Sequence, residues 1–198
     1  MNTIIKDSLA KSFSYEAYRK KISDLLEEGK STGPNQSEDL LHYSTLNDAR
    51  MNRLDKKIKL THSAKEALKS TKEKQTWLLI TEGWCGDAAQ IAPVINKMSI
   101  ESDKVDLKVV LRDENENLMN QFLTNGSKSI PKLVVLNEEN EVISSWGPRP
   151  SIATKMVTDY KEKHGGLDAD FKRDLQVWYN KNKGRSVQED FVKMLSVL

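Results

Sequence analysis

Residues 76–98 read TWLLITEGWCGDAAQIAPVINKM, and this stretch decides the fold that the sequence predicts. Its first part, Trp77 to Ile80, is a short apolar run bounded by Gly83, which is typical of a strand buried on both faces. Its second part, from near Cys85 to Met98, has a helical pattern. Cys85, the only cysteine of the chain, therefore lies where a buried strand passes into a helix.

A cysteine at this junction has its sulfur near unpaired backbone N–H groups and near the positive end of the helix dipole. Both effects favour the thiolate, and they can lower the pKa of a cysteine from about 8.5 to between roughly 3.5 and 7.5. The thiolate is the nucleophilic form of the side chain. We therefore expect Cys85 to be a reactive redox thiol.

Residues 99–163 predict three more strands and two more helices. In chain order they are a strand at Val105–Leu111, a helix that Asp113 and Glu116 begin and Gly126 ends, strands at Leu133–Leu136 and Val142–Trp146, and a helix at about Ser151–Lys163. The strand at Trp77–Ile80 and the strand at Val105–Leu111 need parallel pairing through a right-handed crossover. The last two strands form an antiparallel hairpin. We therefore expect an α/β fold with a mixed sheet and helices on both faces.

The two ends of the chain are polar, with apolar residues at helical spacing. Residues 1–75 predict a helical N-terminal extension, residues 76–163 the core, and residues 164–198 a helical C-terminal extension. Ser63 and Ser186 each precede a glutamate by three positions, which is the spacing of a capping box, and we expect each to begin a helix. We also expect Asp168 to cap a helix. Amphipathic helices must bury their apolar faces, so both extensions should pack on the core and make one elaborated domain.

Composition excludes several classes of function. The 31 basic and 29 acidic residues give a net charge of +2, so nucleic acid and anionic membranes are poor candidates as partners. A single cysteine allows no internal disulfide and no multi-thiolate metal site within one chain, and the three histidines are scattered. We expect no metal and no cofactor. The absence of a long apolar run and of a secretory signal leads us to expect a soluble, cytoplasmic protein.

Several separate elements resemble the thioredoxin family. They are Trp84-Cys85-Gly86 after the buried strand, Pro93 inside the next helix, Ser129-Ile130-Pro131 just before an apolar strand, and Gly147 after the hairpin. Pro131 follows Cys85 by 46 positions, which is close to the interval in that family between the active-site segment and the cis-proline loop. The resemblance covers about residues 76–163 and implies a thioredoxin-like fold.

The resemblance also implies a substrate-binding surface. Trp84 and Gly86 lie beside the thiol in the motif, and Ile130 and Pro131 are similar to the loop that lies next to the reactive cysteine in thioredoxins. The backbone of Ile130 would then pair with an extended segment of a partner chain across the thiol. The partners implied are protein or small-molecule thiols and disulfides.

Two departures from the family pattern decide the mechanism that we expect. The second cysteine of the family motif is Ala88 here, and the strand position that commonly carries a buried acid is Leu79. A dithiol–disulfide cycle within one chain is therefore excluded. We expect Cys85 to act as a monothiol nucleophile on a disulfide or a sulfenic acid, with an external thiol that resolves the adduct.

Asp87 is the unusual residue of the motif. Its charge opposes formation of the Cys85 thiolate, yet the same carboxylate is a candidate acceptor of the thiol proton and a candidate cap of the helix. Glu82 adds to the local negative field. We therefore take Cys85 and Asp87 as the candidate catalytic pair.

Other functions stay open at this point. In one, the fold is a binding module, in which a groove beside Pro131, lined by Trp84 and Ile130, holds a peptide or protein without turnover. Cys85 would then be a small buried apolar residue. In another, two chains bridge an iron–sulfur cluster, but only the first two residues of Cys85-Gly86-Asp87-Ala88 resemble that motif. The sequence leaves the substrate, the resolving thiol and the oligomeric state undetermined.

Overall fold

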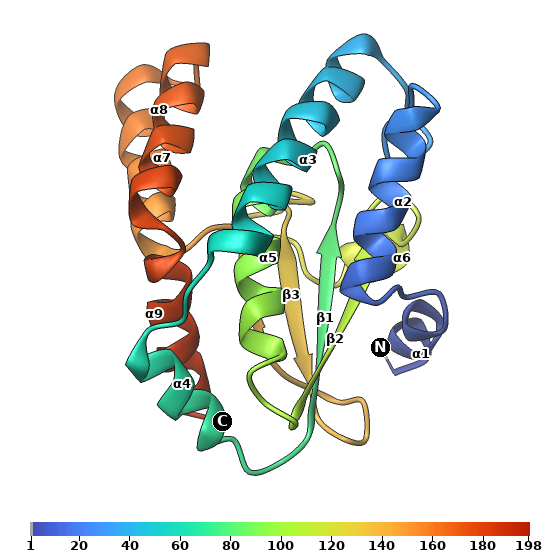
Figure 1. Ribbon diagram of the computed structural model, residues 1–198, viewed down its shortest axis with the longest axis vertical. Helices are drawn as coiled ribbons and strands as arrows, with labels where there is room; N and C mark the ends of the chain where they lie inside the picture. The colour runs from blue at the N-terminus through green and yellow to red at the C-terminus, as the bar shows by residue number, and fades with distance from the viewer. Residues whose placement is uncertain (1) are drawn as a thin grey trace.

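The computed structural model describes residues 2–198, and a mixed sheet forms its centre (Figure 1). Within these residues the sheet has four strands in the order β2-β1-β3-β4. The strands are β1 (Gln75–Thr81), β2 (Val105–Leu111), β3 (Lys132–Leu136) and β4 (Val142–Trp146). β1 pairs in parallel with β2 and antiparallel with β3, and β3 pairs antiparallel with β4. The mixed α/β sheet that the sequence predicts is therefore confirmed.

Helices surround this sheet, and helical segments precede and follow its strands in the chain. They are α1 (Asn2–Ala10), α2 (Tyr15–Glu27), α3 (Glu38–Lys57), α4 (His62–Lys69), α5 (Gly86–Ser99), α6 (Glu116–Met119), α7 (Ser151–His164), α8 (Ala169–Asn182) and α9 (Arg185–Leu195). The connection from β1 to β2 through α5 is the crossover that parallel pairing requires. Both extensions contribute side chains to the same core as the sheet.

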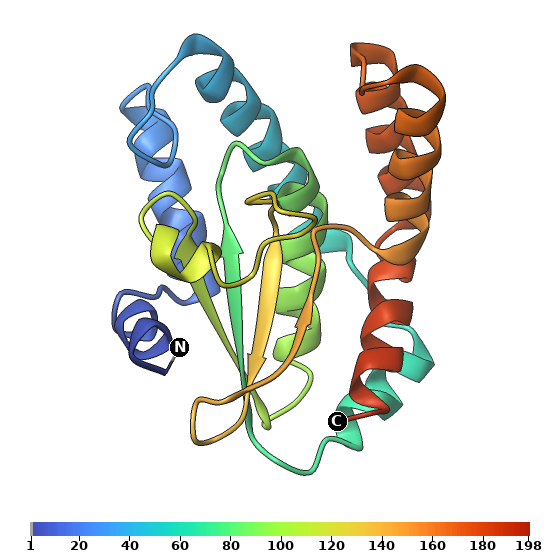
Figure 2. The same cartoon turned by 180° about the vertical axis from the view of Figure 1, so that it is seen from behind.

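The two faces of the sheet bury different sets of helices. Side chains of β1 alternate between the faces, with Trp77 and Leu79 on one side and Leu78 and Ile80 on the other. The Trp77 side packs against α5 and against apolar residues of α2, α3, α4, α7, α8 and α9. The opposite side packs against α1 and α6. Figure 2 shows the sheet from the side opposite α5.

Helix beginnings agree with the sequence in part. Asp168 caps α8 as expected, because its side chain accepts a hydrogen bond from Phe171 N at 2.8 Å. The predictions for Ser63 and Ser186 are wrong. Thr61 caps α4, and α9 follows Gly184, whose φ is 75°. Ser186 N instead donates to the Asn182 side chain at 3.0 Å, so the end of α8 and the start of α9 share one turn.

The helix expected after residue 113 is much shorter than its apolar pattern suggests. α6 is a single turn that begins after Asn115, which makes no side-chain capping bond. Asp113 does not cap it, because its carboxylate pairs with Arg112 at 2.8 Å and its N–H donates to the Glu82 side chain at 2.9 Å. The sequence also did not predict α1, whose Ile5 is buried against the α6 side of the sheet.

The helices of residues 2–198 include none with the length and apolar character that a membrane crossing requires.

Candidate functional site

Cys85 lies at the end of the sheet where β1 passes into α5. It is the N-cap residue of α5, and its sulfur accepts a hydrogen bond from Ala88 N at 3.5 Å. An N-cap residue faces the unpaired N–H groups of the first helical turn. Helix initiation here thus uses the thiol itself, which is why the prediction that Asp87 caps this helix is wrong.

The thiol also contacts the loop that precedes β3. Cys85 Sγ donates to the carbonyl oxygen of Ile130 at 3.4 Å, and both side chains pack in the core on the α6 side of the sheet. The Ile130–Pro131 peptide bond is cis. The structure thus brings together two segments, around residues 85 and 131, that the sequence analysis placed side by side only through resemblance.

Gly147 packs directly behind this loop. Its φ is 116°, and a Cβ at this position would overlap with the carbonyl oxygen of Pro131. Only glycine combines this φ with such a close approach of two backbone segments. Gly147 therefore allows the loop 147–150 to lie against the Ile130–Pro131 segment. This close approach explains why a glycine stands after the hairpin.

Asp87 is held by residues from two distant parts of the chain. Its Oδ2 pairs with Arg149 Nη2 at 2.6 Å, and its Oδ1 accepts a hydrogen bond from the Tyr179 hydroxyl at 2.8 Å. Arg149 comes from the loop before α7, and Tyr179 comes from α8. Both carboxylate oxygens are thus engaged, and neither caps α5 in this arrangement.

The protonation of Cys85 differs from the expectation based on its place at a helix end. The pKa of the thiol is raised to about 12, first because burial disfavours the thiolate and second because Asp87 carries a like charge. Hydrogen bonds from the N–H groups of Ala88 and Asp87 and the charge of Arg149 act in the opposite direction. The side chain is 9% exposed, so the loss of hydration outweighs the helix N-terminus.

Glu82 is a buried carboxyl group three positions before the thiol. It is 1% exposed, accepts hydrogen bonds from the Thr32 hydroxyl and from Asp113 N, and its pKa is raised to about 7, mainly by burial. It links the loop before α3 to the loop after β2. The expectation that Glu82 adds to the local negative field therefore holds only above about neutral pH.

The remaining residues of the predicted substrate surface have partners of their own. The Arg112 guanidinium lies over the Trp84 ring, 4.7 Å from its centroid. Gly86 lies against α8, since Gln176 Nε2 donates to Gly86 O at 3.4 Å. A Cβ on Gly86 would lie 3.3 Å from that nitrogen, so glycine lets α8 approach the motif.

Sequence reasoning missed Arg149 and Gln176, and it took Tyr179 for a packing residue that would border the site only if the C-terminal segment folded over it. One signal was available for Arg149, because it stands between two prolines in Gly147-Pro148-Arg149-Pro150. A charged residue whose neighbours both have fixed φ is presented rigidly. No comparable signal marks Tyr179 or Gln176, which reach the site only because α8 folds back over the first turn of α5.

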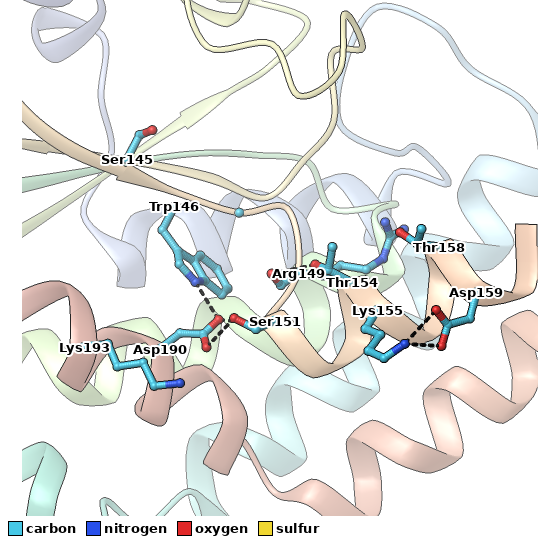
Figure 3. Close-up of a pocket in the computed structure, with 11 residues that line it drawn as sticks. Ser145, Trp146, Arg149, Ser151, Thr154, Lys155, Thr158, Asp159, Asp190 and Lys193 are labelled. Atoms are coloured by element: carbon cyan, nitrogen blue, oxygen red, sulfur yellow. Dashed lines mark hydrogen bonds and ion pairs between the residues drawn. The ribbon is translucent and has the colours of Figure 1, made fainter. Parts of the chain in front are cut away.

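A cavity of about 630 Å³ adjoins Arg149 on the side of β4, α7 and α9 (Figure 3). Within it, Asp190 accepts hydrogen bonds from the Trp146 indole at 3.1 Å and from Ser151 N at 2.8 Å, so it stabilises the start of α7. Cys85 is not among the lining residues. Across residues 2–198, no group of three or more His, Cys, Asp or Glu side chains is arranged to hold a metal ion.

Comparisons with known proteins agree with the fold. A family model described as thioredoxin matches residues 33–161, a range that begins within the predicted N-terminal extension. An HIV epitope scaffold has a similar crystal structure, with a TM-score of 0.59, 17% identity and coverage of 94% of this chain and 99% of its own. The crystal structure of a protein of unknown function from Pseudomonas aeruginosa is also similar, with a TM-score of 0.51 and 14% identity. That match covers 90% of this chain and 99% of the other. No curated protein matches the chain.

Proposed function

This chain belongs to the thioredoxin family, and we propose that it exchanges thiols and disulfides as a monothiol protein, with Cys85 as the nucleophile. The observation that carries the proposal is the position of the thiol, 3.4 Å from the carbonyl of Ile130 and at the N-terminus of α5. This position puts the sulfur between N–H groups that stabilise its thiolate and a backbone segment suited to pairing with a partner chain.

The reaction needs two exchange steps. In the first, the Cys85 thiolate attacks a disulfide, the S–S bond of the partner breaks, a mixed disulfide with Cys85 forms, and the released thiolate takes up a proton. In the second, an external thiol loses its proton and attacks the mixed disulfide, which returns Cys85 as a thiolate. A second disulfide joins the external thiol to the first partner, so electrons balance without any other oxidant or reductant.

Residues of the chain have separate tasks in these steps. The N–H groups of Ala88 and Asp87 stabilise the thiolate of Cys85 when it forms and again when it leaves. In the resting protein the Ile130 carbonyl accepts a hydrogen bond from the thiol. The loop of Ile130 would present its backbone groups to the partner. Ala88, which replaces a second cysteine, leaves the release of the partner to an external thiol.

The test uses the fact that Cys85 is the only cysteine, so any thiol adduct reports on this residue. Native protein is treated with oxidised glutathione or an aromatic disulfide, and the mixed disulfide is measured by mass spectrometry. Turnover is then followed with an added thiol. We expect one adduct per chain and catalysed exchange, both lost in Cys85→Ser while the circular dichroism spectrum is retained. A wild type that forms no adduct and accelerates no exchange would contradict the proposal.

The raised pKa of Cys85 favours a second candidate function, a thioredoxin-fold binding module. In that function the surface around Trp84 and the loop of Pro131 would hold a peptide or protein without turnover. A bound partner would then survive Cys85→Ser but be lost on Trp84→Ala or Pro131→Ala. Loss of the partner on Cys85→Ser, together with catalysed exchange by the wild type, would exclude this second function.

A further inference from the structure

Asp87 is an unfavourable neighbour for a nucleophilic cysteine, yet the fold holds its carboxylate two positions after Cys85. The charge of Asp87 opposes the thiolate, and it is the second cause of the raised pKa of Cys85 after burial. A carboxylate there would hinder the proposed exchange unless another group offset its charge. The two groups that contact it are therefore the place to look for such control.

Arg149 has the geometry to offset that charge. Its Nη2 lies 2.6 Å from Asp87 Oδ2, both side chains are largely shielded from solvent, and the flanking prolines restrict its backbone. Screening by water and salt is weak for a pair of this kind. Arg149 Nε is buried and has no hydrogen-bond partner among the described residues, which costs stability rather than adding to it. A purely structural role explains that arrangement poorly.

Tyr179 completes the arrangement from the other side. Its hydroxyl donates to Asp87 Oδ1 at 2.8 Å, so the carboxylate cannot turn toward the sulfur without losing a partly buried hydrogen bond. Tyr179 lies on α8, outside the range that the family model matches, and Gln176 of the same helix contacts Gly86. The C-terminal extension thus supplies two side chains to the Cys85-Gly86-Asp87-Ala88 segment.

We propose that Arg149 is a positioning residue of the thiol site, which controls Cys85 by holding the Asp87 carboxylate in an ion pair, and that Tyr179 shares this task through its hydrogen bond. The inference rests on the proposed function, in which Cys85 must become a thiolate. Other ionisable groups near the motif are Tyr18 on α2, which interacts electrostatically with Cys85, and Arg50 on α3, near Gly86. Neither contacts Asp87 within the described part of the chain, so their effects should remain when Arg149 is replaced.

The experiment measures how readily Cys85 loses its proton in the full chain, without requiring turnover. Iodoacetamide alkylation is followed against pH, and below the pKa the rate rises tenfold per pH unit, so a displacement between variants gives their difference directly. The ¹³Cβ chemical shift of the single labelled cysteine reports the same protonation without requiring reagent access. Circular dichroism at each pH shows where the fold persists.

Replacement of the arginine gives the main comparison. Arg149→Gln should slow alkylation roughly tenfold or more at a given pH, because a change of one in the pKa alters the thiolate fraction about tenfold. Arg149→Lys keeps the positive charge and should recover most of that loss. In an Asp87→Asn background no carboxylate is left to hold, so Arg149→Gln should slow alkylation clearly less than in the chain with Asp87, leaving only the direct effect of the Arg149 charge on the thiol. Equal slowing in both backgrounds is the result for uncoupled changes; it would show that Arg149 acts through its own charge alone, and it would overturn the proposal.

Tyr179→Phe removes one hydroxyl and should slow alkylation in the same direction but by less. Tyr15→Phe is a matched control, since Tyr15 is also buried and also donates to a carboxylate, Asp55, at 2.8 Å. It should leave alkylation unchanged. Faster alkylation in Tyr179→Phe would mean that Tyr179 shields the sulfur instead, against the proposal.

The measurements separate this inference from the proposed function. Alkylation and ¹³Cβ shifts that respond to Arg149→Gln clearly more strongly when Asp87 is present support the inference even if the wild type exchanges no disulfides. Catalysed exchange with an unresponsive Cys85 would overturn the inference and leave the proposed function standing. A variant that unfolds at a lower temperature but keeps the wild-type pH profile would show that Arg149 is only structural.

Discussion

Replacement of Glu82 by glutamine should change how the stability of the fold depends on pH. Glu82 is 1% exposed, its Oε1 accepts from Asp113 N at 2.9 Å, and its other oxygen accepts from the Thr32 hydroxyl. Glutamine has the same shape, can accept from Asp113 N and can donate to the Thr32 hydroxyl, so the contacts survive. The substitution therefore removes one titration and little else.

The sign and size follow from the pKa of Glu82, which is raised from 4.5 to about 7 in the folded chain, mainly by burial. Between these values the native state binds a proton that the unfolded state has lost, so stability falls as pH rises. The pKa difference corresponds to about 3 kcal/mol in total, most of it lost between pH 5 and pH 8. Glu82→Gln should lack this loss, so its stability relative to that of the wild type should be greater at pH 8 than at pH 5.

Urea unfolding at pH 5 and pH 8 measures the effect. With a slope of about 2 kcal/mol per molar urea, the wild-type midpoint should fall by roughly 1 M more than that of Glu82→Gln over this range. Glu139→Gln, at an exposed position in the β3–β4 connection, is the control and should behave as the wild type. Parallel pH profiles for wild type and Glu82→Gln would refute the assignment of a raised pKa to this carboxyl.

Three further substitutions, one of them with a matched control, test the packing around the site by urea unfolding at constant pH. Gly147→Ala combines a positive φ with overlap against a neighbouring carbonyl, so it should lower the free energy of unfolding by about 2 kcal/mol or more. Gly126→Ala has a positive φ but open space around it, and as the control it should cost about 1 kcal/mol. Equal losses would show that the close approach is unimportant. Phe191→Ala removes a fully buried ring that packs edge-on with two tryptophans and should cost about 3 to 5 kcal/mol, and a loss below about 1 kcal/mol would contradict that packing. Asp168→Ala removes the cap of α8 and should cost about 1 kcal/mol, and an unchanged midpoint would show that this cap contributes nothing.

Local sequence predicted the strands and the central helix well because burial imposes simple patterns. Leu78 and Leu79 face opposite sides of a sheet that is covered on both, and a run of apolar residues is the direct consequence. Helix ends were harder to predict from the sequence. Ser63 and Ser186 have the spacing of caps, but Thr61 and a shared turn after α8 supply the actual starts, and packing between helices selected among these nearby alternatives.

The candidate site divides in the same way. Cys85, Gly86 and Asp87 are adjacent in sequence, so their place at a strand–helix junction followed from local pattern alone. The partners of Asp87 did not, because Arg149 and Tyr179 lie 62 and 92 positions away and meet it only in the folded chain. The interpretation of Asp87 as a cap failed because Cys85 caps α5, while the Asp87 carboxylate contacts these two distant partners instead.

By itself, the sequence determined the chemistry that the chain can carry: one thiol, no second cysteine, no paired histidines, and a strand–helix junction to hold the sulfur. Tertiary structure decided how readily that thiol ionises. The helix N-terminus favours the thiolate, but Ile130 and the core on the α6 side remove Cys85 from water, and burial acts more strongly than the dipole. Hydration and the field of Arg149 depend on segments far apart in the chain, and only the folded molecule brings them together.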